Sequence, residues 1–150
     1  MNPETKELLC RFDEPGVYEV PTGFDYLDLE RRAKQVCEDI ERLGVQVTFE
    51  GAVHNQDASF SIAILLHGFD PKEAALACPS TVRFSNFGNL ATMLFIEQIP
   101  DAIGAEIRTS LSRHGFIYVC ADELDCAYDG VMAERNDVFP TWWIRYFDWL

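Results

Sequence analysis

The stretch from Asp25 to Gly44 constrains the fold most, because its apolar residues recur at helical spacing over about five turns. Asp25 is a favourable N-cap, and Gly44 stands where glycine commonly ends a helix. The apolar stripe consists of Leu29, Ala33, Val36, Cys37, Ile40 and Leu43. We therefore predict an amphipathic helix over residues 25–43, in which Cys37 is a packing residue.

Two segments after this helix alternate apolar and polar residues with a period of two. The first runs from Val45 to Glu50 and the second from Ser59 to Leu66, and residues 51–57 suit a hairpin loop. Alternation of this kind is typical of strands in a sheet that is covered on one face.

Further elements follow at short intervals. They are a helix from Asp70 to Pro79, a hairpin formed by residues 81–85 and 90–96, a helix from Pro100 to Gly115, and a buried strand over residues 116–120. Residues 90–94 would also suit a helix. Because most neighbouring strands can pair as hairpins, we predict an α+β fold, a mostly antiparallel sheet with two main helices packed on one face. The 150 residues suit a single domain.

The two ends of the chain have a different character. Proline and glycine are frequent before Phe24, which argues against long regular structure there, although residues 17–20 suit a short edge strand. Residues 141–149 are predicted to form a last strand with large aromatic side chains on both faces. Either both faces are buried, or one face supplies aromatic and arginine anchors to an interface, where these residue types are enriched.

Acidic residues outnumber basic ones by 25 to 12, which gives a formal net charge of −13. Disorder is not expected, because 48% of the residues are hydrophobic. The acids concentrate in one segment, where six are opposed only by Arg135: Asp122, Glu123, Asp125, Asp129, Glu134 and Asp137. A surface of this charge favours association with a basic partner.

The sequence contains none of the usual motifs for catalysis, phosphate binding or metal binding. His54, His67 and His114 lack the spacing of a metal pair, and residues 122–130 depart from the calcium loop of an EF-hand. The five cysteines lack CxxC spacing, which favours reduced thiols in the cytoplasm. We expect no catalytic residue, metal or cofactor. We also expect no secretory signal or membrane span.

The C-terminal quarter carries the one resemblance in the chain. Its features are the Tyr128-Asp129-Gly130 turn and the closing segment of residues 143–150, with Trp142 and Arg145 in register. A small acidic α+β protein with these features resembles the immunity proteins of bacterial toxin systems. The resemblance implies a cytoplasmic protein that binds its cognate toxin one to one and occludes or distorts the toxin's active site.

We therefore expect a binding protein, and not an enzyme, that neutralises a basic toxin such as a nuclease without contacting nucleic acid or membrane itself. The expected partner-binding residues are Asp122, Glu123, Asp125, Tyr128, Asp129, Glu134 and Asp137. Two alternatives stay open: a DNA-mimic regulator of a nucleic-acid-binding protein, and an enzyme or small-ligand binder whose site forms only in the folded chain. The aromatic C-terminus would also suit a homodimer.

Overall fold

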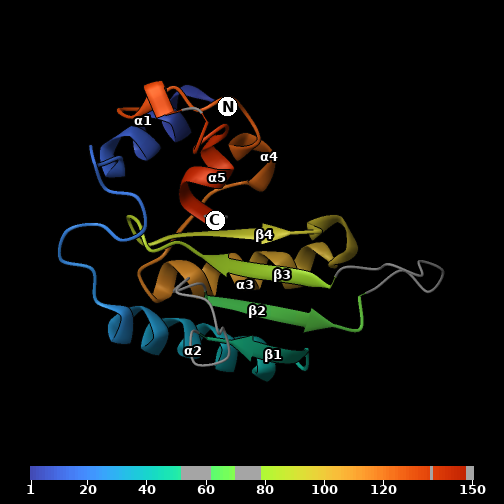
Figure 1. Ribbon diagram of the computed structural model, residues 1–150. Helices are drawn as coiled ribbons and strands as arrows, with labels where there is room; N and C mark the ends of the chain where they lie inside the picture. Colours follow the sequence, from blue (N-terminus) through green and yellow to red (C-terminus); the bar gives the residue numbers. More distant parts are fainter. Residues whose placement is uncertain (52–61, 70–78, 136, 148–150) are drawn as a thin grey trace.

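The computed structural model describes residues 1–51, 62–69, 79–135 and 137–147 (Figure 1). Its sheet has five strands in sequence order: β1 (Gln46–Glu50), β2 (Ile62–His67), β3 (Ser80–Phe84), β4 (Leu90–Leu94) and β5 (Ile117–Tyr118). The first four strands pair antiparallel, and β5 runs parallel to β4. The predicted α+β class is confirmed.

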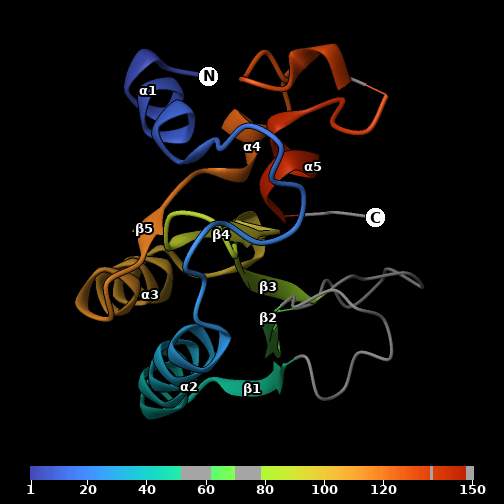
Figure 2. The same ribbon diagram turned by 60° about the vertical axis from the view of Figure 1, so that its left-hand side comes forward.

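Two long helices, α2 (Tyr26–Arg42) and α3 (Asp101–Arg113), lie side by side on one face of the sheet (Figures 1 and 2). The Asp25 carboxylate caps α2 by accepting a hydrogen bond from the backbone N–H of Asp28, and Gly44 follows the helix with a φ of +82°. Both helices were predicted from their apolar spacing, and both predictions are confirmed.

The inner face of the sheet packs on these two helices. Alternate residues of β2 point toward them and are fully buried, while the residues between are only partly covered. The resulting sheet core includes Leu29, Val36 and Ile40 from α2, Ile107 and Leu111 from α3, and Ile62, Ile64, Val82 and Met93 from the strands. Cys37 belongs to this core, and burial raises the pKa of its thiol to about 11.

A second buried group, here called the aromatic cluster, lies beyond β4. It is enclosed by α1 (Pro3–Phe12), α4 (Ala121–Leu124), η3 (Ala133–Arg135) and α5 (Trp142–Phe147). Its buried members are Leu9, Phe87, Leu90, Val119, Leu124, Tyr128, Met132, Phe139, Trp142, Tyr146 and Phe147. Strand β4 serves both groups, because Leu90 joins the aromatic cluster whereas Ala91 and Met93 join the sheet core.

The predicted C-terminal strand is wrong, because this segment forms the helix α5. Within residues 141–147, only Thr141 makes a β-type contact, an isolated bridge to Ala127, and its hydroxyl accepts a hydrogen bond from the backbone N–H of Ile144. Four-residue spacing stacks the rings of Trp142 and Tyr146, whose centroids are 5.8 Å apart. A continuous run of large aromatic residues fits both the two-residue period of a strand and the longer period of a helix. The Thr141 hydroxyl, which caps the first turn, and the stacked rings of Trp142 and Tyr146 favour the helix.

The beginning of the chain also differs from the prediction. Residues 3–12 form the helix α1, where Asn2 accepts the capping hydrogen bond from Thr5 and Pro3 occupies the first turn. Residues 17–20 form no strand. Proline at the first position of a helix is favourable, and this explains why a proline-rich start still contains a helix.

The predicted buried strand over residues 116–120 is shorter and less buried than expected, since only Ile117 and Tyr118 pair with β4 and Ile117 is exposed. The predicted loop at residues 51–57 lies mainly outside the described residues, as do the predicted helix from Asp70 to Pro79 and His54. Within the described part of the chain, no helix has both the length and the apolar content to cross a membrane.

Candidate functional site

A buried ion pair joins the two ends of the chain beneath the acidic segment. The Nε–H of Arg145, on α5, donates to Oδ1 of Asp13 at 2.9 Å, and both side chains are completely buried. The remaining guanidinium nitrogens reach the backbone carbonyls of Tyr18 and Glu14 at 3.3 and 3.4 Å. Arg145 therefore holds the segment that follows α1 against α5.

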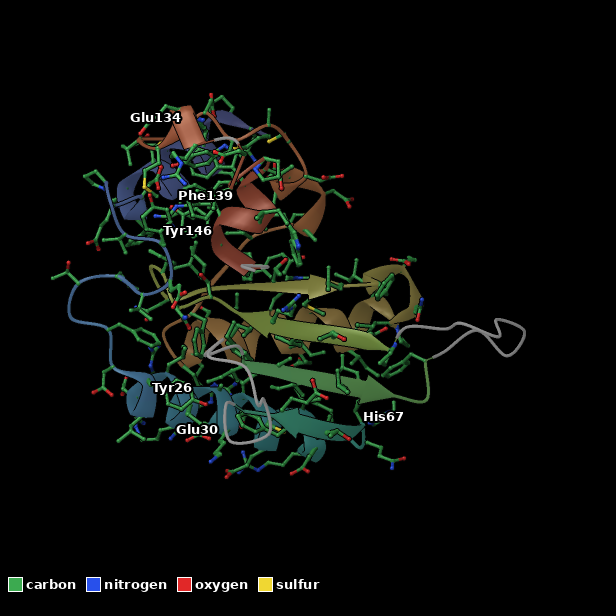
Figure 3. All side chains as sticks on the ribbon, viewed as in Figure 1. Tyr26, Glu30, His67, Glu134, Phe139 and Tyr146 are labelled. Atoms are coloured by element: carbon green, nitrogen blue, oxygen red, sulfur yellow. The ribbon has the colours of Figure 1, made fainter. Side chains whose placement is uncertain are left out.

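Aromatic rings surround this guanidinium. Its Cζ lies 4.4 Å from the ring centroid of Phe87, 5.0 Å from that of Phe139 and 5.7 Å from that of Tyr146. Figure 3 shows Phe139 and Tyr146 within this cluster and Glu134 at its outer end, away from the sheet. Cation–π attraction and the Asp13 carboxylate together offset the cost of removing the guanidinium charge from water.

The other carboxylate oxygen of Asp13 fixes the turn at residues 128–130. It accepts hydrogen bonds from the Tyr128 hydroxyl at 2.6 Å and from the backbone N–H of Val131 at 2.9 Å. Gly130 is required here, because a Cβ at this position would overlap the Asp13 carboxylate and the Tyr128 ring. Burial, and then the hydrogen bond to Asp13, raise the pKa of Tyr128 to about 12.

Tyr128 was predicted as a surface anchor for a partner, but the structure buries its side chain to 5% exposure. Its ring packs edge-on against Trp142, with centroids 4.7 Å apart. Tyr128 therefore positions the acidic segment from within and offers almost no exposed surface of its own.

The helix α1 engages two of the predicted carboxylates. Asn2 and Thr5 donate hydrogen bonds to Glu123, which lower the pKa of this carboxyl, Thr5 having the larger effect. Lys6 pairs with Asp129, which also accepts a hydrogen bond from Nε1–H of Trp142 at 3.1 Å. Lys6 covers the Trp142 ring as well, at 4.4 Å from its centroid.

The other four predicted carboxylates are exposed. Asp137 receives only a long contact of 3.5 Å from Arg135. Within the described residues, no hydrogen bond or ion pair engages Asp122, Asp125 or Glu134. We call Asp122, Asp125 and Glu134 the unpaired acids. They are carried by α4, the residue after it and η3, which pack on the outside of the aromatic cluster.

The histidines of the described region have structural partners. His114 follows α3 and contacts the Asp39 carboxylate of α2 at 2.9 Å, while His67 contacts the Thr48 hydroxyl at 2.8 Å.

No three His, Cys, Asp or Glu side chains of the described residues are arranged to hold a metal ion. The four cysteines that the structure describes are free thiols, and no disulfide joins any two of them: Cys10, Cys37, Cys120 and Cys126.

Sequence reasoning did not identify Asp13 as the centre of this site. The hydrogen-bonded pair of Asp13 and Arg145 is separated by 132 residues, and no local pattern connects the two positions. The four-residue spacing of Trp142 and Tyr146 was the one available indication, because it places Arg145 on the buried side of a helix.

No family model, curated protein or solved structure matches the chain.

Proposed function

We propose that this protein is an inhibitor of the immunity type, which binds a basic toxin one to one in the cytoplasm through the acidic segment of residues 122–137. The observation that carries the proposal is the presence of three unpaired acids on a segment fixed by buried contacts. A carboxylate without an internal partner is free to pair with an incoming cation, and a fixed backbone reduces the entropy lost on binding.

The charge around this segment supports the same interpretation. Residues 1–20 and 117–147 contain eleven acidic and four basic side chains, one of which is the buried Arg145. Complementary charge accelerates encounter between two proteins and disfavours wrong partners. Both effects suit an antidote that must reach its toxin before the toxin reaches its target.

The test is a capture experiment on cells that carry the gene, followed by identification and expression of the retained protein. The proposal predicts a single basic protein, retained one to one at low salt and released as salt increases, that is toxic when produced alone. Co-production of the wild-type chain is expected to relieve this toxicity. A captured protein without toxicity, or no captured protein, contradicts the proposal.

Charge reversal then locates the binding surface. The variant Asp122→Lys/Asp125→Lys/Glu134→Lys is expected to slow association with the captured protein by about tenfold or more, with little effect on dissociation. The matched control is Glu41→Lys/Glu97→Lys/Glu106→Lys, which changes the net charge equally at exposed acids of α2, η2 (Ile96–Gln98) and α3. Equal slowing by the two variants would exclude the acidic segment as the binding surface.

Glu123 and Asp129 are left out of this variant, because Asn2, Thr5 and Lys6 already occupy their carboxylates. Reversal of either charge would disturb the contact of α1, and a change in stability would then obscure the change in binding.

A further inference from the structure

The two edges of the sheet differ in length. At one edge β5 contributes two residues, whereas at the other edge all five residues of β1 pair with β2 in an unbroken register. Among the described residues, no strand pairs with the outer side of β1. Natural edge strands are usually very short, or are protected by lysine, proline or a bulge, because their free N–H and C=O groups can pair with another chain. Strand β1 has none of these protections, and the described residues leave its outer edge open.

The inner face of β1 is also incompletely covered. Val47 and Phe49 pack against the sheet core, yet both side chains are only half-buried. The Nζ of Lys34, on α2, lies 5.6 Å from the centroid of the Phe49 ring. On the neighbouring strand β2, the corresponding Ile62 and Ile64 are fully buried. A further strand beside β1 would complete the burial of Val47 and Phe49, and burial of apolar surface is the main driving force of association.

The sequence of β1 is complementary to itself. Two β1 strands can pair antiparallel about a twofold axis at Thr48, and this register engages all five residues of both strands. It places Val47 opposite Phe49 on the inner face, next to the two sheet cores. On the outer face it places Gln46 opposite Glu50, where the amide can donate to the carboxylate. No two like charges are opposed in this register.

The distribution of charge permits contact between two copies despite the net charge of −13. Residues 26–50, which comprise α2 and β1, contain six acidic and four basic side chains, and the Glu30 carboxylate of α2 pairs with Lys34 at 3.2 Å. Figure 3 shows Glu30 at this end of the molecule. The aromatic cluster and the unpaired acids lie at the opposite end of the sheet, beyond β4 (Figure 1). The most acidic surfaces of two copies would therefore stay far apart.

We propose that this protein forms a homodimer by antiparallel pairing of β1 with β1 of a second copy, which joins the two five-stranded sheets into one. The assembly closes at two copies, because each edge that remains is a two-residue strand β5. The acidic segments lie at its two far ends, so each copy can still bind a partner of its own. The proposal concerns a second surface and is independent of the toxin partner.

The test is sedimentation velocity on the isolated wild-type chain at neutral pH, from about 1 μM to about 1 mM. Salt at about 0.15 M screens the repulsion between distant charges. The expected result is a rise in mass from 17.1 kDa toward twice this value as the concentration increases. A chain that stays monomeric at about 1 mM overturns the proposal, and the edge is then left to an extended segment of a different protein. Assembly beyond two copies overturns it as well.

Opposite charge changes at Gln46 test the register. Gln46→Glu opposes a like charge to Glu50 at two symmetric places and is expected to weaken dimerisation about fivefold, whereas Gln46→Lys is expected to strengthen it about fivefold. Gln46 is exposed, so neither change is expected to disturb the fold of a single copy.

The matched controls are Ala105→Glu and Ala105→Lys, which change the net charge equally on the exposed side of α3. They are expected to leave dimerisation nearly unchanged. If the variants at position 46 have the same effect as those at position 105, the assignment of the interface to β1 is wrong. A stronger dimer with Gln46→Glu than with Gln46→Lys also overturns the proposed pairing.

Discussion

The sheet core and the aromatic cluster are held together in different ways. The sheet core is assembled from regular elements that follow one another along the chain, and outside it lie exposed ion pairs one helical turn apart, such as Glu38–Arg42 and Asp28–Arg31. The aromatic cluster is assembled from the two ends of the chain around an ion pair without solvent exposure, Asp13–Arg145.

This difference shows that an ion pair has one role at the surface of the sheet core and another inside the aromatic cluster. Exposed ion pairs contribute little to stability because water and salt screen them. A buried pair becomes indispensable once formed, because removal of one partner leaves the other charge without compensation. The aromatic cluster thus depends on single polar residues, whereas the sheet core depends on apolar packing.

The largest expected effect follows from removal of Asp13. Asp13→Ala leaves the Arg145 guanidinium buried without an anion and is expected to lower the free energy of unfolding by about 3–5 kcal/mol. Glu38→Gln removes a carboxylate from an exposed pair and is expected to cost less than about 1 kcal/mol. Urea denaturation of both variants measures the difference, and similar losses would contradict the contrast between the two regions.

The next effect tests whether the two regions unfold together. Ile64→Ala removes a fully buried side chain of β2 and is expected to cost about 3 kcal/mol. All three tryptophans lie within residues 142–149, so tryptophan fluorescence reports on the C-terminal region, whereas far-UV circular dichroism reports on the whole chain. Because β4 belongs to both groups, we expect the two transitions to shift together. Fluorescence that keeps its wild-type midpoint would show that the cluster unfolds separately.

A smaller effect is expected at Tyr146. Its buried hydroxyl donates to the backbone carbonyl of Leu9 at 2.6 Å and thereby links α5 to α1. Tyr146→Phe leaves this carbonyl without its donor and is expected to cost about 1–3 kcal/mol. The comparison is Tyr18→Phe, which removes a hydroxyl that is exposed and is expected to change stability by less than about 0.5 kcal/mol. Thermal unfolding at neutral pH distinguishes the two.

The smallest effect concerns pH and the contact between α2 and α3. Hydrogen bonds from Ser110 and then His114 hold the pKa of Asp39 below its usual value of 3.8, and Arg113 adds a favourable charge. A lowered pKa means that the unfolded chain takes up the proton first. The stabilisation is therefore present above about pH 4 and is lost as pH falls through the pKa of the folded state. Asp39→Asn should make stability less dependent on pH in this range, and an unchanged acid profile would contradict this role.

The sequence predicted the sheet core well because each of its elements has a periodic pattern of its own. The stripe of α2, apart from Leu43, which is exposed, and the alternation in β2 identify buried residues without knowledge of the partners. The helix α5 was predicted as a strand, because a run of aromatic residues is compatible with the period of a strand as well as with that of a helix.

The site was predicted only in part. Composition located the acidic segment, but no local pattern reveals that Tyr128 is buried or that α1 binds Glu123 and Asp129. These contacts join residues more than 110 positions apart, and they depend on a docking of α1 that only the folded chain determines.

The separation of Asp13 from Arg145 also has a consequence for biosynthesis. The helix α1 is translated well before the C-terminal residues that pack with Leu9 and bind Asp13, and Arg145 follows Asp13 by 132 positions. At about 5–20 residues per second, about 7–26 seconds pass between the two. During this interval α2, α3 and the sheet can already form while α1 has no partner. The acidic surface is therefore completed only after α5 has been translated.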